Sequence, residues 1–297
     1  MTAEVRPLVF LGTPEASATV LEALLREGFS VVHVITRPDA RRGRGSSLSP
    51  SPVKRVALEH GIDVTHDLMW LEENAGPGLL GIVVAYGRII PTHLLNRMQM
   101  LNIHFSLLPR WRGAAPVERA IMAGDATTGV DIMEVEPTLD TGAVYAERQM
   151  TITDQHTTAS LTSDLAELGA TLLVETLRQG LGVPVAQKGD ATYAAKITAE
   201  DMRIDWTRPS GEIVRQSRAV RAFTVVDELR VRVLEVALVE ESENDSGLIP
   251  GQISPIGLVG TGNGCLRLLR IQPEGKAVMD AAAWLRGRAP HARLHCE

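Results

Sequence analysis

Apolar residues in the first 180 positions follow two patterns that take turns along the chain. Short unbroken runs are typical of buried strands, and apolar residues that recur every three or four positions are typical of helices with one buried face. The runs predict strands over 9–12, 30–36, 81–86, 100–104, 130–135 and 144–152, and the spacings predict helices after Pro14, over 52–60 and over 158–177. Strands that alternate with helices predict an α/β domain with a Rossmann-like, doubly wound and mostly parallel sheet.

The pattern changes in the last third of the chain. Residues 181–205 contain Gly182, Pro184 and Gly189 and have no clear period, so we interpret them as a linker. Beyond Trp206, short β-rich runs separated by glycine and proline predict a small antiparallel barrel. The expected organisation is a first domain over 1–180, a linker over 181–205 and a C-terminal OB-like β-barrel domain over 206–297.

Composition is that of a soluble globular protein. Apolar residues make up 44% of the 297 positions and charged residues 22%, which is an ordinary mix. No apolar run reaches the ~18 residues of a membrane span, and the first residues do not have the form of a signal peptide. Cys265 and Cys296 have no pairing or metal-ligand spacing. We therefore expect a cytoplasmic protein that has no membrane partner and no cysteine nucleophile.

One basic segment stands out against the formal net charge of −6, which itself argues against a general nucleic-acid binder. Residues 37–52 form a Gly/Ser/Pro-containing stretch with four arginines and one acid, between a predicted strand and a predicted helix. Such a stretch is either a solvated flexible loop or a clamp on phosphates. No Gly-Lys-Ser/Thr follows it, which excludes a Walker loop, and the Gly12 turn lacks a dinucleotide fingerprint.

Two polar residues lie close together on an apolar predicted strand. Asn102 and His104 are two positions apart, so they share a face and present an amide and an imidazole to one point at the strand's carboxyl end. A lone histidine is more often structural than catalytic. The asparagine favours a functional interpretation, because polar pairs on a buried strand need a reason.

A third candidate is Asp140, in a Leu-Asp-Thr-Gly turn between two predicted strands. An ordinary hairpin turn is one explanation. An aspartic protease is excluded, because that site needs a second, similar carboxylate to share a proton and the chain has only one such tripeptide. His291, His295 and Cys296 fall in the last seven residues, where a frayed tail explains them better than a metal site.

Taken together, these segments resemble those of the methionyl-tRNA formyltransferases, a folate-dependent family, over most of the chain. The run Ser-Leu-Leu-Pro-Arg-Trp-Arg-Gly-Ala-Ala-Pro over 106–116 is nearly diagnostic of that family. Gly12-Thr13-Pro14 resembles its first turn, 37–54 resembles its tRNA-contacting loop, and the Asp140 turn completes its site. Residues 193–197, 204–206 and 271–276 resemble its linker and C-terminal domain.

The resemblance implies an enzyme that transfers the formyl group of 10-formyltetrahydrofolate to the amino group of methionyl initiator tRNA, for translation initiation. It implies Asn102, His104 and Asp140 as catalytic residues; Asn102 and a protonated His104 would hold the formyl oxygen while Asp140 orients His104. No metal is implied, and we expect a monomer. The implied folate contacts are Val84, Ala85, Tyr86, Gly87, Ser106, Leu107, Leu108 and Pro109, and the implied tRNA contacts are Arg41, Arg42 and Arg44.

Two other interpretations share much of this pattern. Formyltransferases of sugar nucleotides and formyl-donor hydrolases resemble the catalytic half, but they are not expected to carry the 41–52 loop. A catalytically weak RNA- or folate-binding paralogue is the other, because the family's Pro-rich, Trp-containing segment is missing after Thr224. Phe105 also replaces the small residue usual at its position. The complete set Asn102, His104 and Asp140 argues for an enzyme.

Overall fold

The computed structural model describes residues 6–41, 48–239, 247–287 and 294–295, and it divides into two compact units. The N-terminal unit comprises Met1–Pro116, Thr127–Ile152 and Ala159–Ala195. The C-terminal unit comprises Val117–Ala126, Thr153–Thr158 and Lys196–Glu297. The C-terminal unit therefore includes two short pieces that come from between segments of the N-terminal unit.

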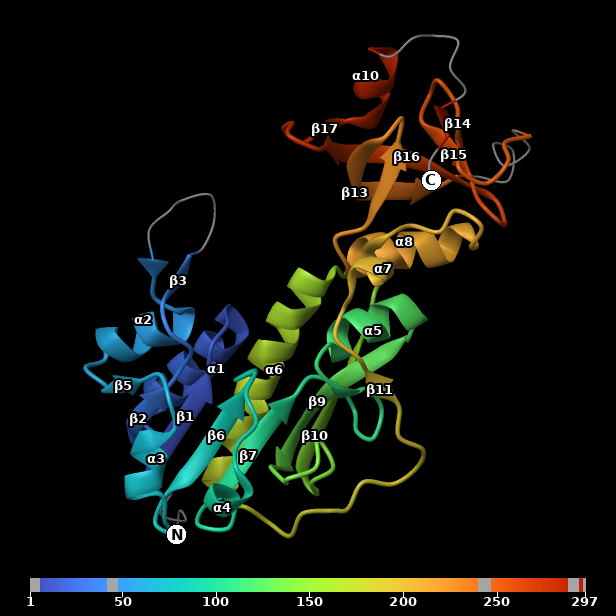
Figure 1. The fold of residues 1–297 in the computed structure, drawn as a ribbon. Helices are drawn as coiled ribbons and strands as arrows, with labels where there is room; N and C mark the ends of the chain where they lie inside the picture. Colours follow the sequence, from blue (N-terminus) through green and yellow to red (C-terminus); the bar gives the residue numbers. More distant parts are fainter. Residues whose placement is uncertain (1–5, 42–47, 240–246, 288–293, 296–297) are drawn as a thin grey trace. The chain divides into compact units, whose positions relative to one another are not determined.

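A seven-stranded sheet forms the centre of the N-terminal unit, in the order β10-β9-β7-β6-β1-β2-β5 (Figure 1). The strands from β7 to β5 are mutually parallel, whereas β9 and β10 add antiparallel pairs at one edge. This arrangement confirms the predicted Rossmann-like, mostly parallel sheet. The strands are β1 (Leu8–Gly12), β2 (Val31–Ile35), β5 (Val64–Thr65), β6 (Leu80–Val84), β7 (Gln99–His104), β9 (Thr127–Glu134) and β10 (Val144–Thr151).

Helices pack on both faces of this sheet. On one face α6 (Thr158–Gln179) lies so close that a Cβ on Gly169 would meet side chains of Ile103 and Val130 at 2.9 and 3.1 Å. On the other face, Val83 and Met100 share a buried cluster with residues of α3 (Met69–Asn74) and α4 (Thr92–Leu95). Asn102 and His104 alternate in step with Met100, so they lie on the α3–α4 face. The remaining helices are α1 (Glu15–Arg26) and α2 (Pro52–Glu59).

The basic stretch before α2 begins and ends as a two-stranded ribbon. β3 (Ala40–Arg41) pairs antiparallel with β4 (Leu48–Ser49), and residues 42–47 between them lie outside the described residues. α2 begins directly afterwards, because the Ser51 side chain accepts a hydrogen bond from the Lys54 backbone N–H at 2.9 Å and proline suits the first helical position.

The C-terminal unit is built on a curled antiparallel sheet, a half-barrel in the order β12-β13-β16-β15-β14-β18, with β17 paired to β16. The pairing of β13 with β16 is irregular on either side of Glu235, and such irregularities bend a strand. The prediction of a small antiparallel β domain is confirmed. Its strands are β12 (Phe223–Val226), β13 (Leu229–Leu238), β14 (Gln252–Ile253), β15 (Leu258–Gly260), β16 (Cys265–Pro273), β17 (Met279–Asp280) and β18 (Leu294–His295).

Helices accompany this sheet as well. Its buried cluster joins Ile213 of α8 and Leu285 of α10 to strand residues such as Val233 and Ile271. Residues 240–246, between β13 and β14, lie outside the described residues. The helices of the unit are α5 (Pro116–Ala123), whose first residue belongs to the N-terminal unit, α7 (Ala199–Met202), α8 (Ser210–Ala219) and α10 (Ala281–Arg286).

The stretch interpreted as a linker contains ordered backbone. β11 (Tyr193–Ala194) pairs with β8 (Arg112–Gly113), and Val185 pairs with Val144. Through Ala195 these residues belong to the N-terminal unit. The domain limits at 180 and 206 stay predictions.

Candidate active site

The polar residues predicted on β7 lie where that strand ends. His104 is the last residue of β7, and Asn102 precedes it by two positions on the same face. Asn102 stands between Val83 of β6 and Met133 of β9 in the sheet. Its side chain is partly buried and has no hydrogen bond to any other described residue. The amide is thus available to a ligand at the carboxyl edge of the sheet.

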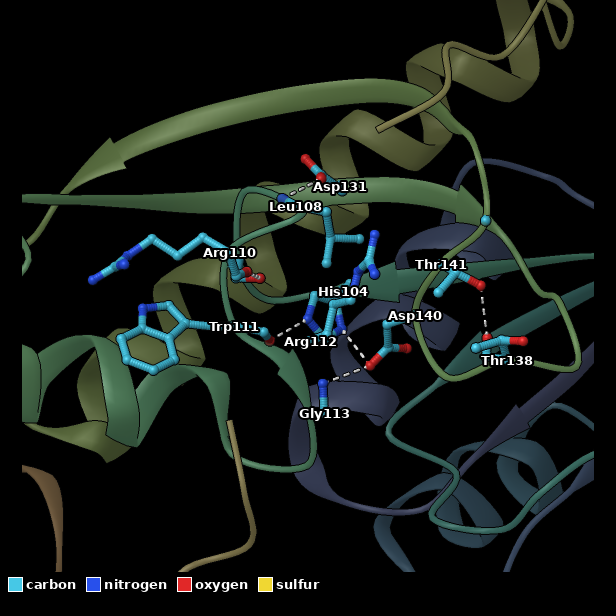
Figure 2. Close-up of polar contacts among 12 residues, drawn as sticks. His104, Leu108, Arg110, Trp111, Arg112, Gly113, Asp131, Thr138, Asp140 and Thr141 are labelled. Carbon is cyan, nitrogen blue, oxygen red and sulfur yellow. Dashed lines mark hydrogen bonds and ion pairs between the residues drawn. The ribbon is translucent and has the colours of Figure 1, made fainter. Parts of the chain in front are cut away.

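The His104 ring is buried, and each of its nitrogens faces an oxygen atom (Figure 2). Nε2 lies 2.9 Å from the Trp111 carbonyl oxygen, and Nδ1 lies 3.8 Å from Oδ2 of Asp140. Because a carbonyl can only accept, Nε2 carries a hydrogen and donates it. In the neutral ring Nδ1 is then an acceptor that faces a carboxylate oxygen. Both atoms can therefore accept a hydrogen from a donor group of a substrate.

Asp140 occupies the turn between β9 and β10 in a left-handed conformation, with φ of 52°. Its Oδ2 also accepts the Gly113 backbone N–H at 2.8 Å. Gly113 has φ of 121°, and a Cβ there would meet the Ala194 carbonyl oxygen at 2.8 Å, so only glycine fits this close approach. The structure therefore brings His104 and Asp140 together. The backbone conformations at Asp140 and Gly113 limit which residue types can occupy these two positions.

The predicted folate residues lie in the turns after two adjacent parallel strands, β6 and β7. The first turn, 84–87, has positive φ at Ala85 and Gly87. In this turn the Tyr86 hydroxyl is buried near the Arg88 side chain, and burial raises the pKa of Tyr86 while Arg88 opposes the rise. In the second turn, Ser106 Oγ donates to the Arg110 carbonyl at 2.6 Å. Parallel strands end at the same edge of a sheet, so both turns flank Asn102 and His104.

Gln187 contacts both sides of this site and was not predicted from the sequence. Its amide nitrogen donates to the carbonyl oxygens of Asp140 and Gly142, both at 2.9 Å. Its amide oxygen accepts from Nε and Nη2 of Arg112, at 3.0 and 2.6 Å. A polar residue in a stretch without period gives no sequence signal of such a role. Gln187 ties the Asp140 turn to the segment that carries Gly113.

Asp131 is a second residue that the sequence did not single out. It is fully buried in β9, and its Oδ2 accepts the Leu108 backbone N–H at 2.8 Å. Burial raises the pKa of its carboxyl to about 7, and Glu147 adds to the rise while the Leu108 N–H opposes it. In the sequence this acid interrupts the apolar run 130–135, but that run predicts a buried strand and indicates no role for the acid.

The predicted tRNA contacts are described only in part. Arg41 is exposed at the end of β3, and Arg42 and Arg44 lie outside the described residues. At the base of the same ribbon, Lys54 Nζ donates to Asp39 at 2.8 Å. Within the described ranges there is no cluster of three or more His, Cys, Asp or Glu side chains that could hold a metal ion, and no helix there is long and apolar enough to cross a membrane.

Comparison with known proteins defines the class of this fold and site. The family model described as formyl transferase matches residues 6–177, and the model for the formyl transferase C-terminal domain matches 196–289. Among solved structures, an N-formyltransferase from Helicobacter canadensis, in complex with folinic acid and dTDP-3-aminofucose, gives a TM-score of 0.68 at 17% identity, over 88% of this chain and 98% of that one. A methionyl-tRNA formyltransferase from Clostridium thermocellum gives 0.59 at 15%, over 79% and 94%. At these identities the likeness shows the fold alone.

Proteins related in sequence assign the chain to a more specific family. The methionyl-tRNA formyltransferase of Corynebacterium aurimucosum is 43% identical over 98% of this chain and 97% of its own length. That of Phenylobacterium zucineum is 42% identical over 95% of this chain and 97% of its own. The chain belongs to the methionyl-tRNA formyltransferase family, and it is a formyl-transferring enzyme.

Proposed function

We propose that this chain transfers the formyl group of 10-formyltetrahydrofolate to the amino group of methionyl initiator tRNA, which supplies the formylated tRNA for translation initiation. The observation that carries the proposal is the approach of His104 to Asp140 at the carboxyl end of β7, beside the Asn102 amide. The nearly full-length likeness to methionyl-tRNA formyltransferases favours tRNA over a sugar nucleotide or water as acceptor. A cytoplasmic location and a monomeric state stay predictions.

The residues near this pair fit a folate. The Asn102 amide is partly buried and has no hydrogen bond to any other described residue, so a polar group is available to a ligand. We propose that the turns 84–87 and 106–109 hold the folate between them. The folate supplies a formyl group on a nitrogen atom that can leave.

Different side chains stabilise the formyl oxygen and move the amine proton. When the amine attacks, negative charge develops on the formyl oxygen, and the Asn102 amide donates a hydrogen bond to it. Because Nε2 of His104 donates to Trp111 and Nδ1 faces Asp140, we assign His104 to the amine proton and not to the formyl oxygen. The pair takes that proton and returns it to the departing nitrogen, so it ends as it began. No covalent enzyme intermediate is needed.

We also propose that Arg41, Arg42 and Arg44 contact tRNA phosphates. Arg41 is exposed on β3, where it can meet a large ligand. Such contacts make tRNA binding weaken as salt concentration rises. A small acceptor would show a weaker dependence on salt.

An acceptor competition tests the function. The protein is incubated with labelled formyl donor and with methionyl initiator tRNA, an amino-sugar nucleotide or water alone. We expect formyl transfer to the tRNA only, and a rate about 10²- to 10⁴-fold lower for His104→Ala, because general acid–base catalysis is lost. Transfer to the sugar nucleotide, or release of formate, would show that the acceptor is a sugar nucleotide or water and not tRNA. Near-normal activity of His104→Ala would overturn the assigned site.

A further inference from the structure

Asp131 is a buried acid in β9, and it lies on the same face of the sheet as the candidate active site. It pairs directly with His104 of β7 and with Glu147 of β10. Directly paired residues of neighbouring strands point to the same face. Asp131 therefore shares the α3–α4 face with Asn102 and His104, whereas α6 packs against Ile103 and Val130 on the opposite face.

Burial of this carboxyl is costly. Asp131 has no exposed surface, and its Oδ1 has no hydrogen-bond partner within the described residues. Its one hydrogen bond within the described ranges joins Oδ2 to the Leu108 N–H (Figure 2). An apolar β-branched side chain would fill such a strand position without the cost of desolvation. A buried acid with a single contact points to a role for that contact.

The segment that Asp131 contacts rests directly on β9. Two positions earlier on the same face, a Cβ on Gly129 would meet Leu107 Cδ2 at 2.4 Å and the Arg148 carbonyl oxygen at 2.3 Å. Gly129 thus leaves room for Leu107, and Asp131 binds the backbone of the next residue. Leu107 therefore packs closely against Gly129, and the Leu108 N–H is hydrogen-bonded to Asp131.

We propose that Asp131 is a positioning residue: by holding the Leu108 amide against β9, it sets the place of the folate-contacting turn 106–109 relative to Asn102 and His104. This inference rests on the proposed function, because the contact of that turn with folate is part of it. Asp131 does not touch the reacting atoms and acts through the turn.

The hold on Leu108 depends on ionisation. A carboxylate makes a stronger hydrogen bond to an N–H than a neutral carboxylic acid does. Burial raises the pKa of Asp131 to about 7, so the stronger bond is lost as pH falls through that value. The titratable residues paired with Asp131 across the sheet are His104 of β7 and Glu147 of β10, and Glu147 adds to the rise of its pKa. Folate binding should therefore weaken in mildly acidic solution.

Two variants separate the contact from the charge. Asp131→Val removes the acceptor, and we expect the KM for 10-formyltetrahydrofolate to rise about 10-fold or more with the KM for tRNA unchanged, since one hydrogen bond to a charged group is lost. Asp131→Asn retains a neutral acceptor oxygen, so its folate KM should match that of the wild type at pH 6, where Asp131 is mostly protonated, and exceed that of the wild type at pH 8. In that variant the dependence of the folate KM on pH between 6 and 8 should disappear.

Thr128→Val is the matched control. Thr128 is also buried in β9 and its hydroxyl has no partner in the described chain, but it lies an odd number of positions from Asp131, on the opposite face. Its folate KM and pH profile should match the wild type. If Asp131→Val does not fold, the pH profile of Asp131→Asn still decides the question.

Equal pH profiles for the wild type and Asp131→Asn, or equal changes in both KM values for Asp131→Val, would overturn the role of Asp131. A wild-type protein that transfers no formyl group would instead overturn the proposed function. Because every comparison starts from wild-type activity, the two failures are distinguishable.

Discussion

Asp140 combines a backbone requirement with a chemical one. Its φ of 52° is a conformation that aspartate, asparagine and glycine adopt most readily. Its carboxylate faces Nδ1 of His104 and accepts the Gly113 N–H. A substitution by alanine would change both properties at once, so asparagine is the more informative replacement.

We expect Asp140→Asn to fold normally and to lose activity. The amide oxygen can still accept the Gly113 N–H, but the side chain no longer attracts or shares a proton with His104. General acid–base catalysis contributes about 10²- to 10⁴-fold, so kcat should fall within that range. Steady-state kinetics and a thermal melt of the same preparation measure the two effects.

Asp227→Asn is the control for this change. Asp227 also has a left-handed backbone, with φ of 48°, in the turn between β12 and β13. The same substitution there should leave kcat unchanged. A loss of activity in both variants, or in neither, would contradict the assignment of Asp140.

At the scale of elements, residues 185–194 hold the site in place. Val185 pairs with Val144, Gln187 binds the Asp140 turn, and the Thr192 N–H donates to the Pro109 carbonyl at 3.1 Å. The Trp111 N–H in turn donates to Oγ1 of Thr192 at 2.9 Å. This segment therefore fixes the turn that carries Asp140 relative to the loop that carries Trp111, whose carbonyl orients His104.

Gln187→Met tests this role with little change in side-chain volume. The variant loses the four hydrogen bonds of the amide, so the Asp140 turn can shift relative to His104. Small misplacements of catalytic groups cost up to about 100-fold in rate, and we expect kcat to fall by about 10- to 100-fold. Initial rates at saturating folate and tRNA measure the change.

Gln216→Met provides the comparison. Its amide nitrogen also donates to two backbone carbonyls, those of Asp201 and Arg203, both at 2.9 Å, but within the C-terminal unit. It should cost stability without lowering kcat. A similar loss of kcat in the two variants would indicate a general loss of stability and would argue against positioning by Gln187.

The sequence predicted the strands of the sheet better than the side-chain contacts that hold the site residues in place. Apolar runs mark buried strands, and the polar pair Asn102 and His104 on one strand was visible for the same reason. Gln187 acts through contacts with residues 45 to 75 positions away, in a stretch without a hydrophobic period. Such contacts leave no local pattern, so the sequence indicated only a linker there. Asp131 was hidden because a single acid does not disturb an apolar run.

At the scale of the whole molecule, the two units contain carboxyls with opposite pKa shifts. Burial raises the pKa of Asp131 in the N-terminal unit to about 7. In the C-terminal unit, hydrogen bonds from Arg119 lower the pKa of Asp201 to about 2, against an opposing effect of burial. Two hydrogen bonds of 2.7 and 2.9 Å join Arg119 to Asp201. The pH dependence of stability should therefore differ in sign between these two sites.

Because the pKa of Asp131 is raised in the folded state, its contribution to stability is fully present below about pH 4, the pKa of an unfolded aspartate. This contribution is lost as pH rises through about 7. Relative to Asp131→Asn, the wild type should lose on the order of a few kcal/mol of unfolding free energy between pH 5 and 8. A lowered pKa acts in the opposite sense. Relative to Asp201→Asn, the wild type should lose about 1 to 2 kcal/mol as pH falls from 4 toward 2.

Urea denaturation of the wild type and both variants across this pH range measures these differences. The two curves of variant minus wild type should slope in opposite directions. Curves that run flat for both variants would show that neither carboxyl titrates differently in the folded protein.

The membership of α5 in the C-terminal unit limits how this protein can be cut or recombined. Arg119 of α5 pairs with Asp201, and Arg215 of α8 donates to the Met122 carbonyl at 3.3 Å. A gene fragment that stops near residue 195 encodes α5 without these partners. An exchange of C-terminal halves between relatives would likewise join this helix to a surface that did not evolve with it. The unit of inheritance in such chimaeras is the C-terminal half together with residues 117–126.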